Sequence, residues 1–432
     1  MDFIILAVLI AEVLLLSGVE NRLTGTRITP FGVLAFPYLA VVLLAFISAP
    51  VLDFVPLDTS SLMVWVCGLF LVWLMGYLVI LIFPSAQISR DIASRLLSDF
   101  PGEASGQRIA KLLGVIVIPL LVLGIVQSVR AVGGWWNIGS REFREVQGHG
   151  LSAHALLLAE PLFILLMGTA KKRNKFQIIL AVILMAFFLV DQVKGRALQA
   201  LIGGLLYRVL RGRSTVSAKS VVAVVLSAYL VFMSVYMIGA GALDPSQLTD
   251  SETYISYSRH FCYYLTAGVL GFSEASHYGI RDVGGGSYVE IFRPFVDLYR
   301  KLISGSNPVG LGSTREKGMQ IDLTVNNGST DSNVYTLFGT LYLYLGSFGL
   351  IAYVIVMALL CYALFLSAGW SKNEWLLVLY CYLGAQLLFG FFEFYFWHGD
   401  TYEIAVITGT LATMSFSNTR RFQLRSGPVY SH

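Results

Sequence analysis

Long apolar runs constrain this chain more than any other feature of its sequence. A helix needs about 20 apolar residues to cross a bilayer core. We therefore predict an all-α integral membrane protein of about eleven transmembrane helices, with ten or twelve as the alternatives. The predicted spans, with soft edges, are 2–18, 31–49, 61–83, 112–132, 152–170, 176–192, 197–210, 219–241, 346–368, 374–392 and 402–417.

The composition agrees with a membrane protein. Of the 432 residues, 56% are hydrophobic and only 13% are charged, and the mean hydropathy is +0.71. Soluble domains carry about 25% charged residues. We expect residues 1–432 to form a single polytopic membrane domain whose first span is retained and not cleaved as a signal peptide. The four scattered cysteines include no CxxC pair, so no metal site is expected, and we predict no cofactor and no nucleic-acid partner.

Basic residues orient the predicted spans, because cytoplasmic loops retain Lys and Arg. This rule places the N-terminus outside and the C-terminus inside, which requires an odd number of spans. Eighteen of the 30 basic residues lie in alternate loops: Arg22, Arg27, Arg90, Arg95, Arg108, Lys111, Lys171, Lys172, Arg173, Lys175, Arg208, Arg211, Arg213, Lys219, Lys372, Arg420, Arg421 and Arg425. Five histidines then fall on the outer side: His149, His154, His260, His277 and His398.

The segment 242–333 is predicted to be a large outer loop. Its aromatic and branched residues argue against disorder, so we expect helical pieces that fold over the outer mouth of the bundle. It contains two glycine-rich turns, 283–287 and 310–313. These are either flexible hinges or cradles for phosphate made of backbone N–H groups.

Cations collect in two shorter outer segments. Lys194 and Arg196 lie at the turn between two spans, where they either snorkel to the interface or bind an anion. Arg141 and Arg144 follow two tryptophans, which form either an interfacial belt or part of a ligand site.

The end of the large loop is predicted to start a helix. Asp331, Ser332 and Asn333 are residue types that cap helices, and a helix N-terminus attracts phosphate. An ordinary cap is the alternative. Gly346 and Gly349 are then expected to permit close helix packing.

The loop between the last two spans contains a group of acids with one histidine. Glu393, His398, Asp400 and Glu403 suit acid or base chemistry, or they form an ordinary acidic outer loop. Arg259 and Arg293 are cations that we expect near these groups. A further acid, Glu160, stands inside a span before Pro161, which predicts a broken helix that lines a cavity.

The segment SNVYTLFGTLYLYLGSFGLI, 332–351, resembles the signature of Wzy-type O-antigen and repeat-unit polymerases. In these proteins Asn, Tyr and Thr precede a span with a Gly-x-x-Gly motif. The span count, the late outer loop and the Lys-Gly-Arg turn at 194–196 are also similar. Two features depart from the related patterns. A histidine precedes the matching asparagine in the O-antigen ligases, whereas Ser332 stands here, and the outer loops lack the Arg-x10-Gly motif of some polymerases.

The resemblance implies a GT-C-like glycosyltransferase of the bacterial inner membrane with a periplasmic N-terminus, a cytoplasmic C-terminus and a periplasmic loop at 242–333. Such an enzyme transfers a growing glycan from undecaprenyl diphosphate to the non-reducing sugar of another lipid-linked unit, with inversion and without a metal. Its partners are undecaprenyl-diphosphate-linked oligosaccharide and membrane lipids, and a chain-length regulator protein is a candidate. An O-antigen ligase and a flippase or transporter of lipid-linked sugars are the alternatives.

The resemblance also implies roles for particular residues. Arg196 would contact the diphosphate, and Asn333 and Tyr335 would form the loop-end signature. The predicted diphosphate-binding set is Arg141, Arg144, Lys194, Arg196, Arg259 and Arg293. The candidates for a catalytic base are Asp331, Glu393 and His398.

Overall fold

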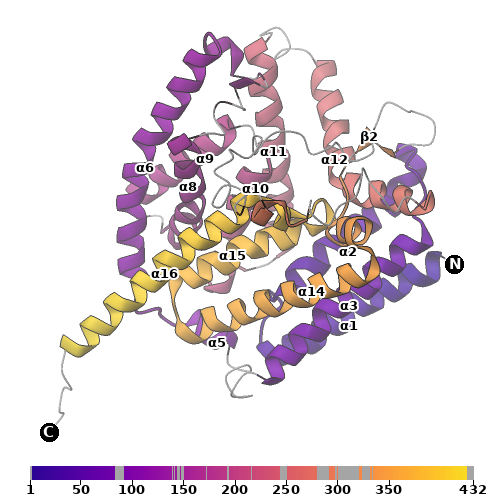
Figure 1. Ribbon diagram of the computed structural model, residues 1–432, viewed down its shortest axis with the longest axis horizontal. Coiled ribbons are helices and arrows are strands. Elements are labelled where there is room, and N and C mark those ends of the chain that lie inside the picture. Colours follow the sequence, from indigo (N-terminus) through magenta and orange to yellow (C-terminus); the bar gives the residue numbers. More distant parts are fainter. Residues whose placement is uncertain are drawn as a thin grey trace. The chain divides into compact units, whose positions relative to one another are not determined.

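The structure is a computed structural model, and it is helical through most of the residues that it describes (Figure 1). Those residues are 2–82, 92–138, 140, 142–143, 146, 150–171, 173–191, 194–215, 217–243, 251–279, 291–296, 299, 321–323, 331–332 and 334–425. Two strands of two residues each, β1 (Ile321–Asp322) and β2 (Asp331–Ser332), pair antiparallel. The prediction of an all-α architecture is confirmed apart from this short pairing.

Each predicted span coincides with a helix. Among the residues that the structure describes, seven helices are long and apolar enough to cross a membrane, which supports the membrane class, whereas the number eleven stays a prediction. In chain order the helices are α1 (Asp2–Thr24), α2 (Pro30–Leu52), α3 (Thr59–Ile82), α5 (Ile92–Leu97), α6 (Glu103–Ala131), η1 (Trp135–Asn137), α8 (Gly150–Thr169), α9 (Lys175–Val190), α10 (Lys194–Leu210), α11 (Ala218–Leu243), α12 (Ser251–His277), α14 (Leu337–Ser371), α15 (Glu374–Leu388), η3 (Phe389–Phe391), η4 (Tyr395–Trp397) and α16 (Gly399–Arg425).

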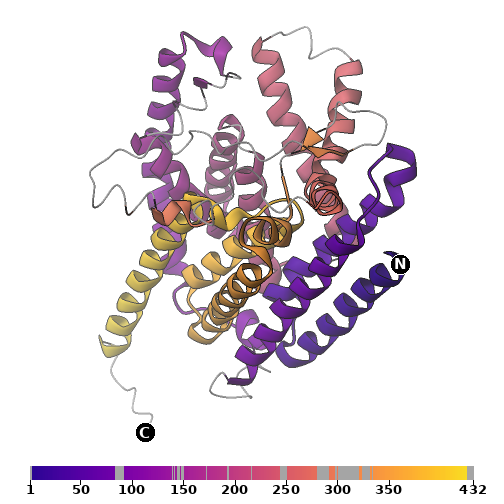
Figure 2. The same cartoon turned by 45° about the vertical axis from the view of Figure 1, so that its right-hand side comes forward.

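Contacts within the chain define two compact units. The first consists of Met1–Asp91, Arg259–Ala363 and Gln386–Thr401, and the second of Ile92–Ser258, Leu364–Ala385 and Tyr402–His432. In the first unit α1 and α3 run side by side, as two views show (Figures 1 and 2).

Helix α12 gives the segment 242–333 a long helical element, as expected. Its second half is buried, and two glycines bring it against other backbone segments of the first unit. A Cβ added to Gly268 would lie 2.2 Å from the carbonyl oxygen of Phe392, and one added to Gly271 would lie 2.7 Å from that of Val334. This half of α12 is therefore part of the core of the first unit and not a loose covering of it.

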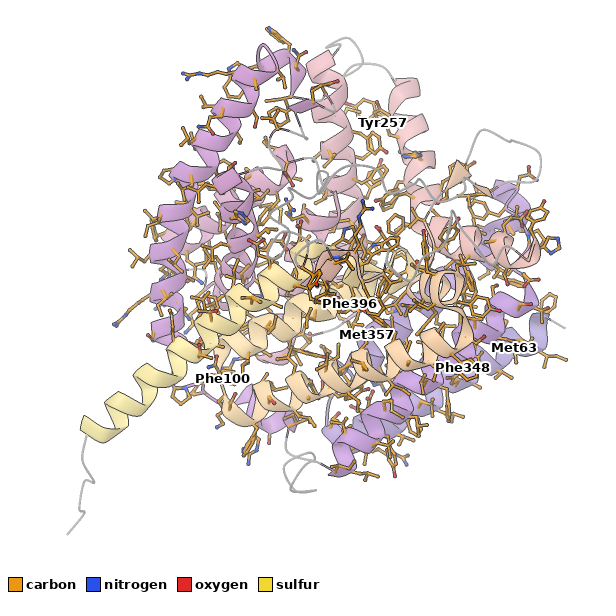
Figure 3. All side chains as sticks on the ribbon, in the orientation of Figure 1. Met63, Phe100, Tyr257, Phe348, Met357 and Phe396 are labelled. Atoms are coloured by element: carbon orange, nitrogen blue, oxygen red, sulfur yellow. The ribbon has the colours of Figure 1, made fainter. Side chains whose placement is uncertain are left out.

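Helix α14 is interrupted at Gly346, where φ is 65° and ψ is −174°. A Cβ on this residue would meet nothing within 4 Å, so the prediction that Gly346 permits close helix packing is wrong. The close contact at Gly349 is within α14 and not between two helices, because a Cβ added there would lie 2.3 Å from Cβ of Leu345. Phe348 is 92% exposed just beyond the break (Figure 3). The glycine thus turns the chain at a conformation that side chains strongly disfavour.

In the second unit α8 packs against α6, α9 and α10. Apart from Ser152, His154 and Glu160 it is apolar between its ends, and it is buried along most of its length, as expected for a helix without a continuous polar face. Two arginines bind its C-terminal carbonyls. Nη1 of Arg208 donates to Ala170 (3.1 Å) and Nη1 of Arg213 to Gly168 (3.0 Å). Cations at a helix C-terminus interact favourably with its partial negative charge, so this end of α8 is firmly held.

We predict that Gly346→Ala destabilises the protein by about 1–3 kcal/mol, because alanine strains the backbone at this φ and ψ. Gly409→Ala is the matched control, since Gly409 lies in α16 with open space around its Cβ position, and alanine favours helix. Thermal unfolding of the purified protein in detergent measures both changes. Equal melting temperatures for the two variants would contradict the role given to Gly346.

Candidate functional site

Arg196 stands in the first turn of α10 and is held by two carboxylates from neighbouring elements. Its Nε lies 3.0 Å from Oε1 of Glu160 on α8, and its Nη1 donates to Oδ2 of Asp191, just after α9, at 2.5 Å. The side chains are 15%, 3% and 6% exposed, respectively. The three helices α8, α9 and α10 therefore meet at one largely buried ion cluster, which we call the Arg196 cluster.

The charge of this cluster qualifies the predicted role of Arg196. The two carboxylates and the guanidinium have a combined formal charge of −1. The positive charge of Arg196 is therefore already balanced by its neighbours. A guanidinium is a planar group with five N–H donors. The arrangement fixes the orientation of the planar group, which suits bidentate binding of a further oxyanion.

Glu160 reaches Arg196 from an unbroken helix. Pro161 lies inside α8, yet the helix runs from Gly150 to Thr169, so the prediction of a broken helix here is wrong. Tight packing by three neighbouring helices outweighs the loss of one backbone donor. The acid inside the span is explained by its ion pair and not by a cavity.

A second ion pair in the same unit joins α8 to α16. Nδ1 of His154 lies 2.5 Å from Oε1 of Glu403, and the side chains are 63% and 36% exposed. His154 is in the second turn of α8, and Glu403 is near the start of α16. The pair is accessible, in contrast to the Arg196 cluster.

In the first unit the predicted pair Glu393 and His398 is brought together. Oε1 of Glu393 lies 3.4 Å from Nε2 of His398, and the histidine side chain is 40% exposed. The segment that carries Arg293 lies next to this pair, because a Cβ on Gly399 would be 4.0 Å from Cβ of Pro294. The expectation that the Arg293 cation meets these acids stays a prediction.

Two aromatic rings lie beside His398 of the Glu393–His398 pair. The ring centroid of His398 lies 5.8 Å from that of Tyr395 and 6.2 Å from that of Trp397. Phe394 and Phe396 follow at 6.0 Å from one another, and Phe396 is labelled in Figure 3. Flat apolar rings beside a carboxylate and an imidazole provide both stacking surfaces and hydrogen-bond acceptors.

The loop-end signature differs from the prediction. Asp331 and Ser332 form β2, and α14 begins only at Leu337, so the helix start predicted at 331–333 is wrong. The cap is Thr336, whose hydroxyl accepts from the N–H of Gly339 at 3.0 Å. Ser332 instead accepts from the N–H of Val334 at 3.1 Å, which holds the strand end in a turn.

Tyr335 lies between β2 and α14, and it is only 2% exposed. Burial raises the pKa of its phenol well above the ordinary value, so the group stays neutral near pH 7. A neutral buried phenol does not serve as a base. Tyr335 therefore acts in packing or as a hydrogen-bond donor.

Several predicted residues lie outside the described part of the chain. Arg141, Arg144, Asn333 and both glycine-rich turns do so entirely. Lys194 begins α10, Arg259 lies within α12 and Asp331 lies in β2, but their side chains are not described. Among the described residues no group of three potential ligands from His, Cys, Asp and Glu is placed to hold a metal ion.

Sequence reasoning missed two pairings. Glu160 attracted notice inside a span, and charges within membrane helices usually have partners, but no local pattern in the sequence identified Arg196 as its counter-ion. His154 and Glu403 stand 249 residues apart, and no local pattern connects them.

Arg196→Ala should lower the free energy of unfolding by about 3–5 kcal/mol, because two buried carboxylates lose their cation. The neutral triple variant Arg196→Met, Glu160→Leu and Asp191→Asn should recover most of that loss, because no buried charge remains unpaired. Thermal unfolding in detergent compares the two with the wild-type protein. A triple variant that melts as low as Arg196→Ala would contradict this account of the cluster.

Comparison with known proteins finds no match among curated proteins and none among solved structures. One family model, described only as a family of unknown function, matches residues 53–421. That range includes the Arg196 cluster and both histidine–glutamate pairs. The chain belongs to this family of unknown function, DUF6337.

Proposed function

We propose that this chain is a membrane glycosyltransferase that polymerises oligosaccharide units carried on undecaprenyl diphosphate. Three independent features support the proposal. The segment 332–351 resembles the Wzy-type signature, the helices are those of a membrane protein, and a pre-oriented guanidinium stands among apolar helices. The substrate and the reaction come from the resemblance, and the site gives them a chemical basis.

The Arg196 cluster is the observation that carries the proposal. Ionisable side chains within membrane helices are costly, and those that persist usually serve a substrate, an ion or a partner. A diphosphate leaves with negative charge that the enzyme must stabilise, and such stabilisation is often the largest catalytic contribution. Arg196 would make these bonds through N–H groups whose direction Glu160 and Asp191 already set.

The reaction is a displacement at the anomeric carbon of the growing glycan. A hydroxyl oxygen of the acceptor unit forms the new bond to that carbon, and the bond from the carbon to the diphosphate oxygen breaks. The electron pair leaves with the diphosphate, and the hydroxyl proton passes to a base. Arg196 stabilises the departing oxygens.

Within the first unit, the surroundings of Glu393 and His398 suit a sugar. Sugar hydroxyls donate to carboxylate and imidazole acceptors, while their C–H faces stack on rings such as Tyr395 and Trp397. Arg293, on the adjoining segment, would contact phosphate or a sugar hydroxyl. Hydropathy and the distribution of basic residues support eleven spans with the N-terminus outside. By the resemblance, the membrane is the bacterial inner membrane and a chain-length regulator is a candidate partner.

The test is chain extension by the purified protein in bilayers supplied with undecaprenyl-diphosphate-linked oligosaccharide units. Wild-type protein should produce glycans of several units, and the neutral triple variant should be folded but inactive. Arg196→Lys retains the charge without the planar fork, so extension should slow by about 10²–10³-fold.

Other products would overturn the proposal. Lipid-linked units that cross the bilayer without growing would identify a flippase or transporter. Transfer to a lipopolysaccharide core acceptor, with no transfer to a second unit, would identify a ligase.

A further inference from the structure

We propose that His154, oriented by Glu403, is the base that removes the proton from the acceptor hydroxyl; this role rests on the proposed glycosyl transfer. His154 was not a candidate for the base from the sequence, whereas Glu403 belonged to the acidic group that suits acid or base chemistry. His154 is the catalytic residue in this proposal, and Glu403 is a positioning residue that acts through it.

The short contact defines the chemistry of the imidazole. A carboxylate only accepts hydrogen bonds, so Nδ1 of His154 donates its proton to Oε1 of Glu403 across 2.5 Å. The proton on Nδ1 leaves Nε2 of the neutral ring as the acceptor. Glu403 therefore selects the tautomer that a base requires, and it stabilises the imidazolium that forms when Nε2 takes a proton.

Access separates this pair from the other acidic groups. The His154 side chain is 63% exposed, so a substrate hydroxyl can reach Nε2. Glu160 and Asp191 are 3% and 6% exposed and are committed to Arg196. In the Glu393–His398 pair it is Nε2 that faces the carboxylate, at the longer distance of 3.4 Å.

Helix α8 links the base to the cation for the leaving group. Glu160, which holds Arg196, follows His154 by six residues, about 9 Å along the axis and about 120° around it. Helix α8 therefore carries both His154 and the carboxylate that holds Arg196 on one rigid support.

The proton transfer completes the reaction without another reactant. The acceptor oxygen bonds to the anomeric carbon as its proton moves to Nε2 of His154. The electron pair of the broken bond stays on the diphosphate beside Arg196. The imidazolium then returns its proton to water.

Chemical rescue tests this role directly. In the bilayer extension assay, His154→Gly should lower kcat by about 10²–10⁴-fold while KM for the lipid-linked unit changes little. Added imidazole should restore a large part of the rate in proportion to its concentration, because the side chain is accessible and glycine leaves room. Glu403→Gln should lower kcat without rescue by imidazole.

His277→Gly is the matched control, because His277 is 64% exposed and its Nδ1 lies 3.9 Å from a carboxylate oxygen of Asp58. This variant should extend glycans at the wild-type rate. Exposed ion pairs contribute little to stability, so all three variants should melt close to the wild-type protein.

The outcomes separate the two proposals. If wild-type protein extends glycans while His154→Gly is unaffected, or is impaired but not rescued, the role of His154 is overturned and the proposed function stands. Rescue of His398→Gly in place of His154→Gly would transfer the role to the other pair. If wild-type protein forms no longer glycan, the proposed function fails and this role fails with it.

Discussion

The ion cluster of Glu160, Arg196 and Asp191 is the interaction on which the second unit and its proposed chemistry depend. Each charge would be costly alone among apolar helices, and each is tolerable only because the others are within hydrogen-bond distance. The cluster ties α8, α9 and α10 together, and the arginines at the far end of α8 hold its carbonyls. Helix α8 is therefore held both at Glu160 and at its C-terminus, which makes it a rigid support for a reactive site.

Rigidity has a functional consequence for the residues that α8 carries. Catalytic groups must keep their distances to within a fraction of an ångström, and sites on packed helices do so better than sites on loops. His154 and Glu160 are both on α8, so their separation is set by helix geometry. The Glu393–His398 pair is built differently, on a short irregular segment lined by aromatic rings, as suits contact with sugars.

Hydropathy predicted the helices well because the apolar runs are local, and all eleven segments coincide with helices. It failed where the determining contact is distant or depends on backbone geometry. Helix α12 was expected only as helical pieces, because Arg259, His260 and Glu274 interrupt its apolar pattern. Its second half is nevertheless buried. The helix start predicted at 331–333 was wrong because β2 pairs with β1 there and Thr336 provides the cap. For the site, residue type singled out Arg196, Glu393 and His398, but the partners of Arg196 and the His154–Glu403 pair depend on the tertiary fold.

The proposed function requires Arg196 to recognise a lipid diphosphate. Native mass spectrometry of the purified protein with undecaprenyl diphosphate and undecaprenyl monophosphate measures this recognition without any catalytic turnover. Wild-type protein should prefer the diphosphate by about tenfold or more, equivalent to about 1.4 kcal/mol, and the folded neutral triple variant should lose this preference. Equal affinity of the wild-type protein for the two lipids, or an unchanged preference in the triple variant, would contradict it.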